Sequence, residues 1–208
     1  MLRLIGGAAA ALVALTLSGC CTPAVVGSLP VTRHAQETSN WCWAGSGQMV
    51  MDFLGHDTSQ CTQANNRFGR NDCCGITLCP NPQAPTYDMN GNCTGCACPG
   101  WPEFQKYGFK FKRTSSAALS WDDLRKQLSN EKNCKKTPVA YSWGWTGGGG
   151  HMMVAKGYLT LNGTNYVVIL DPWAPCHGDE RIITYDAYVS SAGSYTHWDD
   201  FYDVTYSP

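Results

Sequence analysis

Cysteines limit what this chain can fold into more than any other feature of its sequence. Seven of the twelve in the 208-residue chain fall between residues 61 and 100, a segment that also carries four prolines. Few runs in this segment favour a helix or a strand, so it needs cross-links to hold a shape. Two alternatives are open, because the cysteines could form disulfides or bind zinc, the latter through Cys93-x-x-Cys96-x-Cys98 with Cys73, Cys74 and Cys79.

The N-terminus favours the first alternative, because it has the pattern of an export signal. One early charge, Arg3, precedes a small and apolar run over residues 4–17, which is short for a membrane-spanning helix. We therefore predict a signal peptide over residues 1–19. An exported protein meets an oxidising environment, so we expect disulfides, no bound metal and no other cofactor.

The end of the signal suggests a lipid anchor. The sequence Leu17-Ser-Gly-Cys20 resembles the lipobox of bacterial lipoproteins. This resemblance implies cleavage before Cys20, a lipid on that residue, and an exported protein held at a membrane of the cell envelope. The alternative is ordinary cleavage at small residues, which would leave Cys20 and Cys21 as structural thiols.

The cysteine count also bears on pairing. Setting aside Cys20 and Cys42, which is assigned a different role below, leaves ten cysteines, an even number. If Cys21 is unpaired, nine remain and one of them is free. The connectivity stays open, because it cannot be deduced from spacing.

Beyond the signal, the composition fits one globular domain. The chain is 43% hydrophobic and 15% charged, so it can bury a core. Its net charge of −1 leaves no basic surplus, and we expect no nucleic-acid partner. Residues 20–35, with Pro23 and Pro30, are predicted to be the lipidated N-terminus and a tether. The domain is predicted over residues 36–208 and is expected to be a monomer.

The pattern along this domain changes from helices to strands. A helix is predicted over residues 41–54 with Ser39 or Asn40 as its cap, and a shorter helix follows a capping box that starts at Ser120. Five strands are then predicted over residues 138–145, 151–160, 166–170, 181–185 and 201–206.

This order predicts an α+β fold. A helical, disulfide-rich lobe over residues 36–136 would pack on an antiparallel β lobe over residues 137–208, with Asn162-Gly163 as a hairpin turn. We expect the substrate site in the cleft between the lobes.

Cys42 differs from the other cysteines because it lies at the start of the first predicted helix. The exposed backbone N–H groups and the helix dipole at such a position stabilise an anion, so they favour the thiolate, which is the reactive form of cysteine. Cys42 is therefore the candidate nucleophile.

Three other residues complete a candidate catalytic set. His151 follows four glycines at the start of a predicted strand and is the candidate base. Asp171 ends the strand that the predicted hairpin places beside it, so it could orient the imidazole. Gln36 could donate to a developing oxyanion. The remaining histidines are predicted to be solvated: His34, His56, His177 and His197.

Together these residues resemble the papain-like cysteine peptidases. The shared features are Gln36 six residues before Cys42, Trp43 directly after it, a strand that starts at Gly150-His151, and Asp171 followed two residues later by Trp173. The resemblance is closest to a bacterial branch of secreted peptidases and effector proteases of plant pathogens. It covers residues 36 to about 175, matches 61–100 poorly, and lacks the family's usual disulfide partner just before the nucleophile.

The resemblance implies a two-lobe papain-like fold and an endopeptidase that cleaves protein or peptide substrates. A Cys42–His151–Asp171 triad would form a thioacyl-enzyme intermediate, Gln36 and the Cys42 N–H would stabilise the oxyanion, and Trp43 and Trp173 would support the cleft. Two alternatives stay open. One is a cell-wall amidopeptidase or transglutaminase-type acyltransferase with the same chemistry, and the other is a non-catalytic, disulfide-stapled binding lipoprotein.

Overall fold

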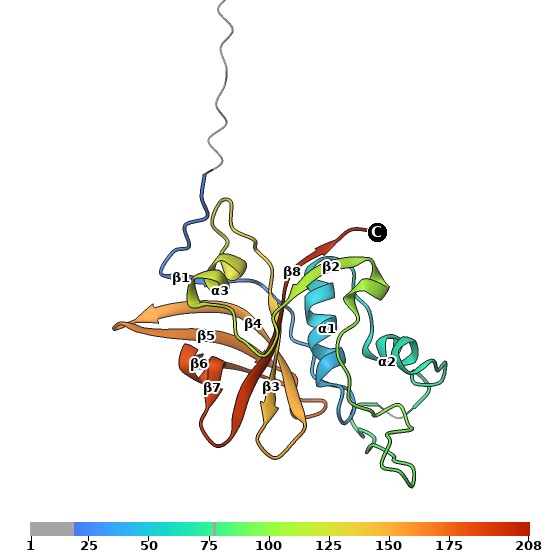
Figure 1. Ribbon diagram of the computed structural model, residues 1–208. Coiled ribbons are helices and arrows are strands. Elements are labelled where there is room, and N and C mark those ends of the chain that lie inside the picture. Colours follow the sequence, from blue (N-terminus) through green and yellow to red (C-terminus); the bar gives the residue numbers. More distant parts are fainter. Residues whose placement is uncertain (1–18, 77) are drawn as a thin grey trace, which may run out of the picture.

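The computed structural model describes residues 19–76 and 78–208 (Figure 1). The predicted signal peptide lies outside the described residues except for Gly19. None of the described helices is long and apolar enough to cross a membrane. The elements are, in chain order, β1 (Val26–Ser28), α1 (Cys42–Phe53), α2 (Gln60–Phe68), the 3-10 helix η1 (Phe104–Tyr107), β2 (Phe109–Arg113), α3 (Trp121–Leu128), β3 (Val139–Trp145), β4 (Gly150–Leu161), β5 (Thr164–Asp171), β6 (Asp179–Thr184), α4 (Tyr185–Val189), β7 (Ser190–Ser191) and β8 (Tyr195–Tyr206).

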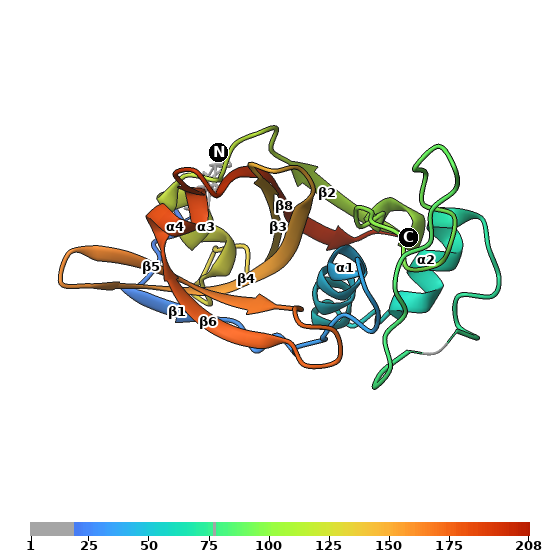
Figure 2. The ribbon, with the colours of Figure 1, turned by 90° about the horizontal axis from the view of Figure 1, so that it is seen from below.

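The strands form one antiparallel sheet in the order β2-β8-β3-β4-β5-β6, to which β1 adds against β4 and β7 against β8. The sheet curls strongly, so that α4 and β7 lead from its β6 edge back towards β8 (Figure 2). The predicted α+β class is confirmed. However, β2 lies in the segment predicted as helical and pairs with β8 as an edge strand, so the sheet is not confined to the residues after 136.

The hairpin between β4 and β5 has the predicted turn. Asn162 and Gly163 have φ angles of 50° and 78°, which is the left-handed backbone that a tight two-residue hairpin requires. This turn fixes the register of the two strands and pairs Val154 with Leu170. The far ends of β4 and β5 then carry His151 and Asp171.

The helix α1 lies between the sheet and α2 (Figures 1 and 2). It is buried over most of its length, and its first turn can pack closely because Gly45 lacks a side chain. A Cβ on Gly45 would lie 3.2 Å from the carbonyl oxygen of His34 and 3.3 Å from the Cβ of Pro172. This close approach brings the start of α1 against the turn that follows β5.

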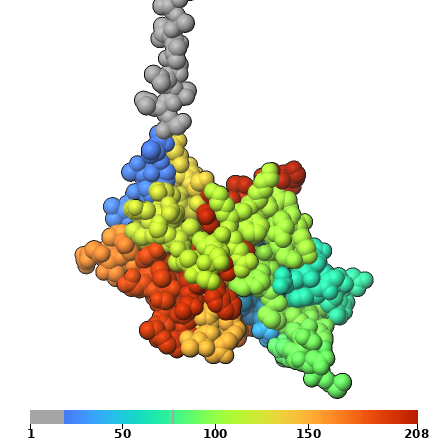
Figure 3. All heavy atoms as spheres, in the orientation of Figure 1, coloured from blue at the N-terminus to red at the C-terminus, as the bar shows by residue number. Residues whose placement is uncertain are grey.

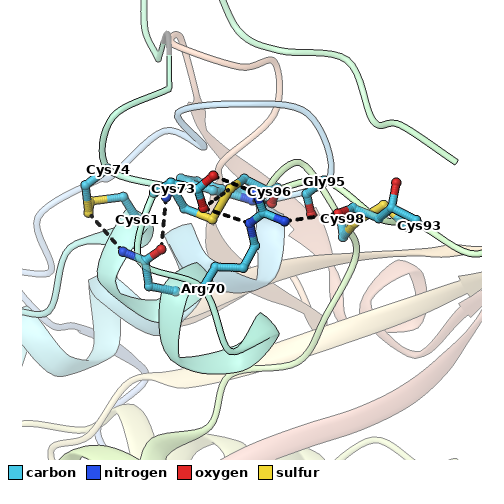
Figure 4. The surroundings of a disulfide bond; sticks show 12 residues. Cys61, Arg70, Cys73, Cys74, Cys93, Gly95, Cys96 and Cys98 are labelled. Carbon is cyan, nitrogen blue, oxygen red and sulfur yellow. Dashed lines mark hydrogen bonds and ion pairs between the residues drawn. A yellow bond between two sulfur atoms is a disulfide. The ribbon is translucent and has the colours of Figure 1, made fainter.

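The disulfide-rich segment forms the side of the molecule away from the β4–β5 hairpin, as the space-filling view shows (Figure 3). Ten cysteines pair, so the predicted disulfides are confirmed, and Cys20 and Cys42 are the two free cysteines among the described residues. Three of the bridges lie close together within this segment (Figure 4). The five pairs are Cys21–Cys134, Cys61–Cys74, Cys73–Cys96, Cys79–Cys176 and Cys93–Cys98.

The prediction of a tether over residues 20–35 is wrong for most of this segment, because it packs on the domain. Cys21 is bonded to Cys134, and β1 pairs with β4. Leu29 and Val31 are buried in the hydrophobic core. Burial of Leu29 and Val31, which lie just after β1, stabilises this packing, and Pro23 and Pro30 do not prevent it because both lie outside the strand.

Candidate active site

The start of α1 is fixed by the two tryptophans on either side of Cys42. Trp41 and Trp43 are almost fully buried, and their indole N–H groups donate to the carbonyl oxygens of Cys96 (2.7 Å) and Cys98 (3.2 Å). The disulfide-rich segment therefore holds the residue between them in place. This role could not be predicted from the residue pattern, because it depends on which distant segment the two indoles contact.

The predicted cap of α1 is wrong. Its N-cap residue is Trp41, which makes no side-chain capping hydrogen bond. Asn40 has a φ of 63°, and its amide donates instead to the carbonyl of Ala97, 3.1 Å away. The first N–H groups of α1 thus have no side-chain acceptor at the N-cap, which leaves the positive end of the helix dipole facing Cys42.

His151 and Asp171 are in contact. Because β4 and β5 are antiparallel and Val154 pairs with Leu170, Asp171 lies diagonally across from His151 on the same face of the sheet. Nε2 of His151 and Oδ1 of Asp171 are 2.6 Å apart. This contact leaves the other ring nitrogen of His151 free to face the cavity that it shares with Cys42.

Asp171 is almost fully buried and has two further donors. The backbone N–H of Trp173 donates to its Oδ1 at 2.9 Å, and Nη2 of Arg181 donates to its Oδ2. Arg181 was not among the predicted site residues. The one sequence signal for Arg181 was its position at the start of the strand predicted over residues 181–185, which follows the strand that ends at Asp171.

The electrostatics favour a charged pair at this site. Burial alone would lower the pKa of His151, but its interactions with Asp171 and with Cys42 outweigh burial and raise the pKa to about 9. Burial would raise the pKa of Asp171, but the hydrogen bond and charge of His151 outweigh it, with help from Arg181, and the pKa falls below its usual value. The imidazolium and the carboxylate thus stabilise each other.

Gln36 is buried beside these residues. Its backbone N–H donates to the carbonyl of Pro172 at 3.0 Å, and its own carbonyl accepts from Cys176 at 2.8 Å. Its side-chain amide donates to the carbonyl of Thr38 at 3.0 Å, which leaves the second N–H of that amide. The structure thus anchors Gln36 to the turn after Asp171, next to the first turn of α1.

Two hollows lie on either side of His151. Cys42 and His151 both line a cavity of about 320 Å³, which Trp101 and Trp198 also border. The second hollow, of about 420 Å³, lies against Asp171, Trp173 and Arg181. Trp173 is 57% exposed as a residue, and its ring stands nearly perpendicular to the imidazole of His151, with 6.5 Å between the ring centroids.

His197 corrects the prediction that the remaining histidines are solvated. It is buried, its Nε2 lies 3.0 Å from Oδ1 of the buried Asp200, and its Nδ1 lies 2.9 Å from the carbonyl of Tyr188. β8 begins earlier than predicted, so His197 pairs with Trp143 inside the sheet instead of lying in a loop. It does not line either of the two hollows beside His151.

Two groups of side chains in the described part of the chain have metal-ligand atoms close together. One is Asp72 with Cys73 and Cys96, but these sulfurs are joined in a disulfide and are not thiolates. The other is His34 with Asp52 and Asp57, where His34 and Asp52 already pair at 2.9 Å. Neither lies at Cys42.

Comparison with known protein families gives a match over most of the chain. The model of the Peptidase_C39 like family matches residues 28–204, which include Gln36, Cys42, His151 and Asp171. No curated protein matches the chain.

Proposed function

The chain belongs to the Peptidase_C39 like family, which supports a cysteine peptidase that acts on protein or peptide substrates, and from this premise we propose a Cys42–His151–Asp171 mechanism. One observation carries the proposal. Cys42 is the one free thiol among the described residues of the domain; it begins a helix and shares a cavity with the imidazole of His151, which contacts the buried carboxylate of Asp171.

The mechanism follows from these positions. His151 takes the proton of the Cys42 thiol, and the thiolate attacks the carbonyl carbon of the scissile bond. The oxyanion accepts hydrogen bonds from the Cys42 N–H and the free N–H of the Gln36 amide. His151 protonates the leaving amine as the C–N bond breaks, and then removes a proton from the water that hydrolyses the thioester. Asp171 holds the imidazole in its tautomer and orientation throughout.

The related alternatives differ in the group that accepts the acyl chain or in the third residue. A transglutaminase-type enzyme would pass the acyl group to an amine, whereas the peptidase passes it to water. We favour an endopeptidase of the bacterial branch with Asp as the third residue, because Asp171 and not a second histidine contacts His151. One chain supplies all four residues, so the proposed mechanism needs no second copy, and we propose that the protein acts as a monomer.

The proposal is tested by measuring substrate cleavage and covalent labelling of Cys42 on the same purified protein. We expect the purified chain to cleave casein, and iodoacetamide to block cleavage while mass spectrometry finds the added group on Cys42. Mass spectrometry of the reaction with an added primary amine then separates hydrolysis from acyl transfer. Labelling of Cys42 without turnover of casein or of a peptide library would support the binding lipoprotein instead.

We also propose that Cys20 carries a lipid and anchors the protein at the cell envelope. Cys20 is free and exposed, and the bond from Cys21 to Cys134 would hold the anchor close to the domain. The described chain begins at one end of the domain, while the start of α1 and the β3–β4 turn lie at the opposite end (Figure 1). An anchored domain would therefore present its cleft away from the membrane.

Incorporation of labelled fatty acid should be lost in Cys20→Ser, whereas unchanged incorporation would contradict lipidation at this residue.

A pH profile gives a further prediction. Catalysis needs His151 to be protonated in the charged pair, and its pKa is raised to about 9. We therefore expect kcat/KM to fall as the pH rises through about 9, measured with a fluorogenic peptide at constant ionic strength. A fall centred near the ordinary histidine value would mean that Asp171 and Cys42 do not stabilise the imidazolium.

A further inference from the structure

The cavity beside Cys42 contains a cation that the mechanism does not use. Arg67, in the last turn of α2, lines this cavity together with Cys42 and His151. No Asp or Glu is among the described residues that line it. Its other walls are largely apolar, with Trp101, Trp198 and Met152 among them. A peptide in the cavity would meet one permanent positive charge close to the nucleophile.

The hydrogen-bonding capacity of Arg67 is largely unused. A guanidinium has five N–H donors, yet its one hydrogen bond within the described chain runs from Nη1 to the carbonyl of Trp101 at a long 3.4 Å. Its Nε is buried without a partner. About a quarter of the side chain is exposed, so the group has donors to spare for a ligand.

The charge of Arg67 is also only partly balanced. The nearest carboxylate is Glu103, whose Oε1 lies 3.8 Å from Nη1 of Arg67. The same carboxylate contacts Nζ of Lys106 through Oε2 at 2.9 Å. Two cations thus share one anion, and a positive charge is left over at the side of the cavity.

Packing, and not ion pairing, holds the guanidinium in this place. Its central carbon lies 5.5 Å from the ring centre of Trp43, the residue directly after the nucleophile. Gly100 makes room for it, because a Cβ there would lie 2.4 Å from Nε of Arg67. The group is therefore preorganised, which lowers the entropy cost of binding a ligand.

We propose that Arg67 binds a carboxylate of the substrate, so that the enzyme prefers an Asp or Glu side chain near the scissile bond. This inference rests on the proposed peptidase function and deepens it by naming the substrate class. A guanidinium and a carboxylate can form two parallel hydrogen bonds, which neutral side chains cannot match. The tryptophans of the cavity would hold apolar atoms of the residues beside the acidic one.

The test uses quenched fluorogenic peptides that differ only by Glu, Gln or Lys at one position, scanned on both sides of the scissile bond. At one position we expect kcat/KM for the Glu peptide to exceed that for the Gln peptide by about tenfold or more. Arg67→Gln should bring this ratio close to one, and Arg67→Glu should favour the Lys peptide. Arg67→Lys should keep part of the preference, because it keeps the charge but not the planar fork.

Arg70→Gln is the matched control. Arg70 is exposed, pairs with Asp72 at 2.6 Å and does not line the cavity, so its loss should leave the ratio unchanged. Because the ratio compares two substrates of one enzyme, a variant that only weakens the fold lowers both rates and keeps the ratio.

Two results would overturn the inference while the peptidase proposal stands. One is equal cleavage of the Glu and Gln peptides at every position by the unaltered chain, and the other is an Arg67→Gln variant that keeps the full preference. If no peptide of the set or of a random library is cleaved in a Cys42-dependent way, it is the proposed function that fails.

Discussion

Cys42→Ala is expected to lower kcat for peptide hydrolysis by about 10⁵-fold or more, because no other group described in the cavity can form the thioester. Cys42 forms no disulfide, so its removal breaks no cross-link, and alanine favours the helix that begins there. We therefore expect the melting temperature to stay nearly constant. Initial rates on a quenched peptide, with circular dichroism on the same samples, measure both effects.

Cys20→Ser is the matched control for this variant, since Cys20 is the other free cysteine and lies outside both hollows. It should keep full hydrolytic activity in detergent solution. Hydrolysis that survives in Cys42→Ala at more than a hundredth of the original rate would remove Cys42 from the mechanism.

Asp171→Asn is expected to lower kcat by about 10³- to 10⁴-fold with little change in KM. Asparagine has nearly the same shape, but both oxygens of Asp171 accept hydrogen bonds, so the NH2 group of the new amide must face a donor, either Nε2 of His151 or Nη2 of Arg181. The substitution also removes the charge that stabilises the imidazolium, so the alkaline fall in kcat/KM should move from about 9 towards the ordinary histidine range. This shift separates a role at His151 from general damage to the fold.

The same variant should change how stability depends on pH. The pKa of His151 lies above its usual 6.5 in the folded chain, so its protonation stabilises the fold fully below about pH 6.5. This contribution is lost as the pH rises through about 9. Asp171→Asn should remove most of this slope in thermal melts. Asp179→Asn is the control, because Asp179 pairs with Asp171 in the sheet register but is exposed.

Much of the fold could be predicted from residue patterns. The alternation of apolar and polar residues placed β3, β4, β5 and β6 to within a few residues, and the Asn162-Gly163 turn has the backbone that its residue types favour. The helix α2 was missed because six of its nine residues are polar. A hydroxyl cap from Ser59 and the Cys61–Cys74 bridge stabilise it instead of a long apolar stripe.

Errors in the prediction came where burial depends on partners far along the chain. His197 looked like a solvated residue, but an extended β8 carries it into the sheet beside Asp200. The segment from Cys21 to Val31 looked like a tether, but β4 offers it an edge to pair with and Cys134 a sulfur to bond. Local composition does not contain such long-range pairings.

The candidate site also has features that the sequence predicts and features that only the tertiary structure shows. The amino-acid sequence by itself determined the reactive groups, because a thiol at a helix start, an imidazole and a carboxylate at strand ends are set by residue type and local pattern. Only the tertiary structure decided which distant residues surround these groups. Arg181 donates a hydrogen bond to Asp171, Trp41 and Trp43 donate to carbonyls of the disulfide-rich segment, and Arg67 lines the cavity. The physical reason is that hydrogen bonds and charges act over a few ångströms of space, whatever the separation of the residues along the chain.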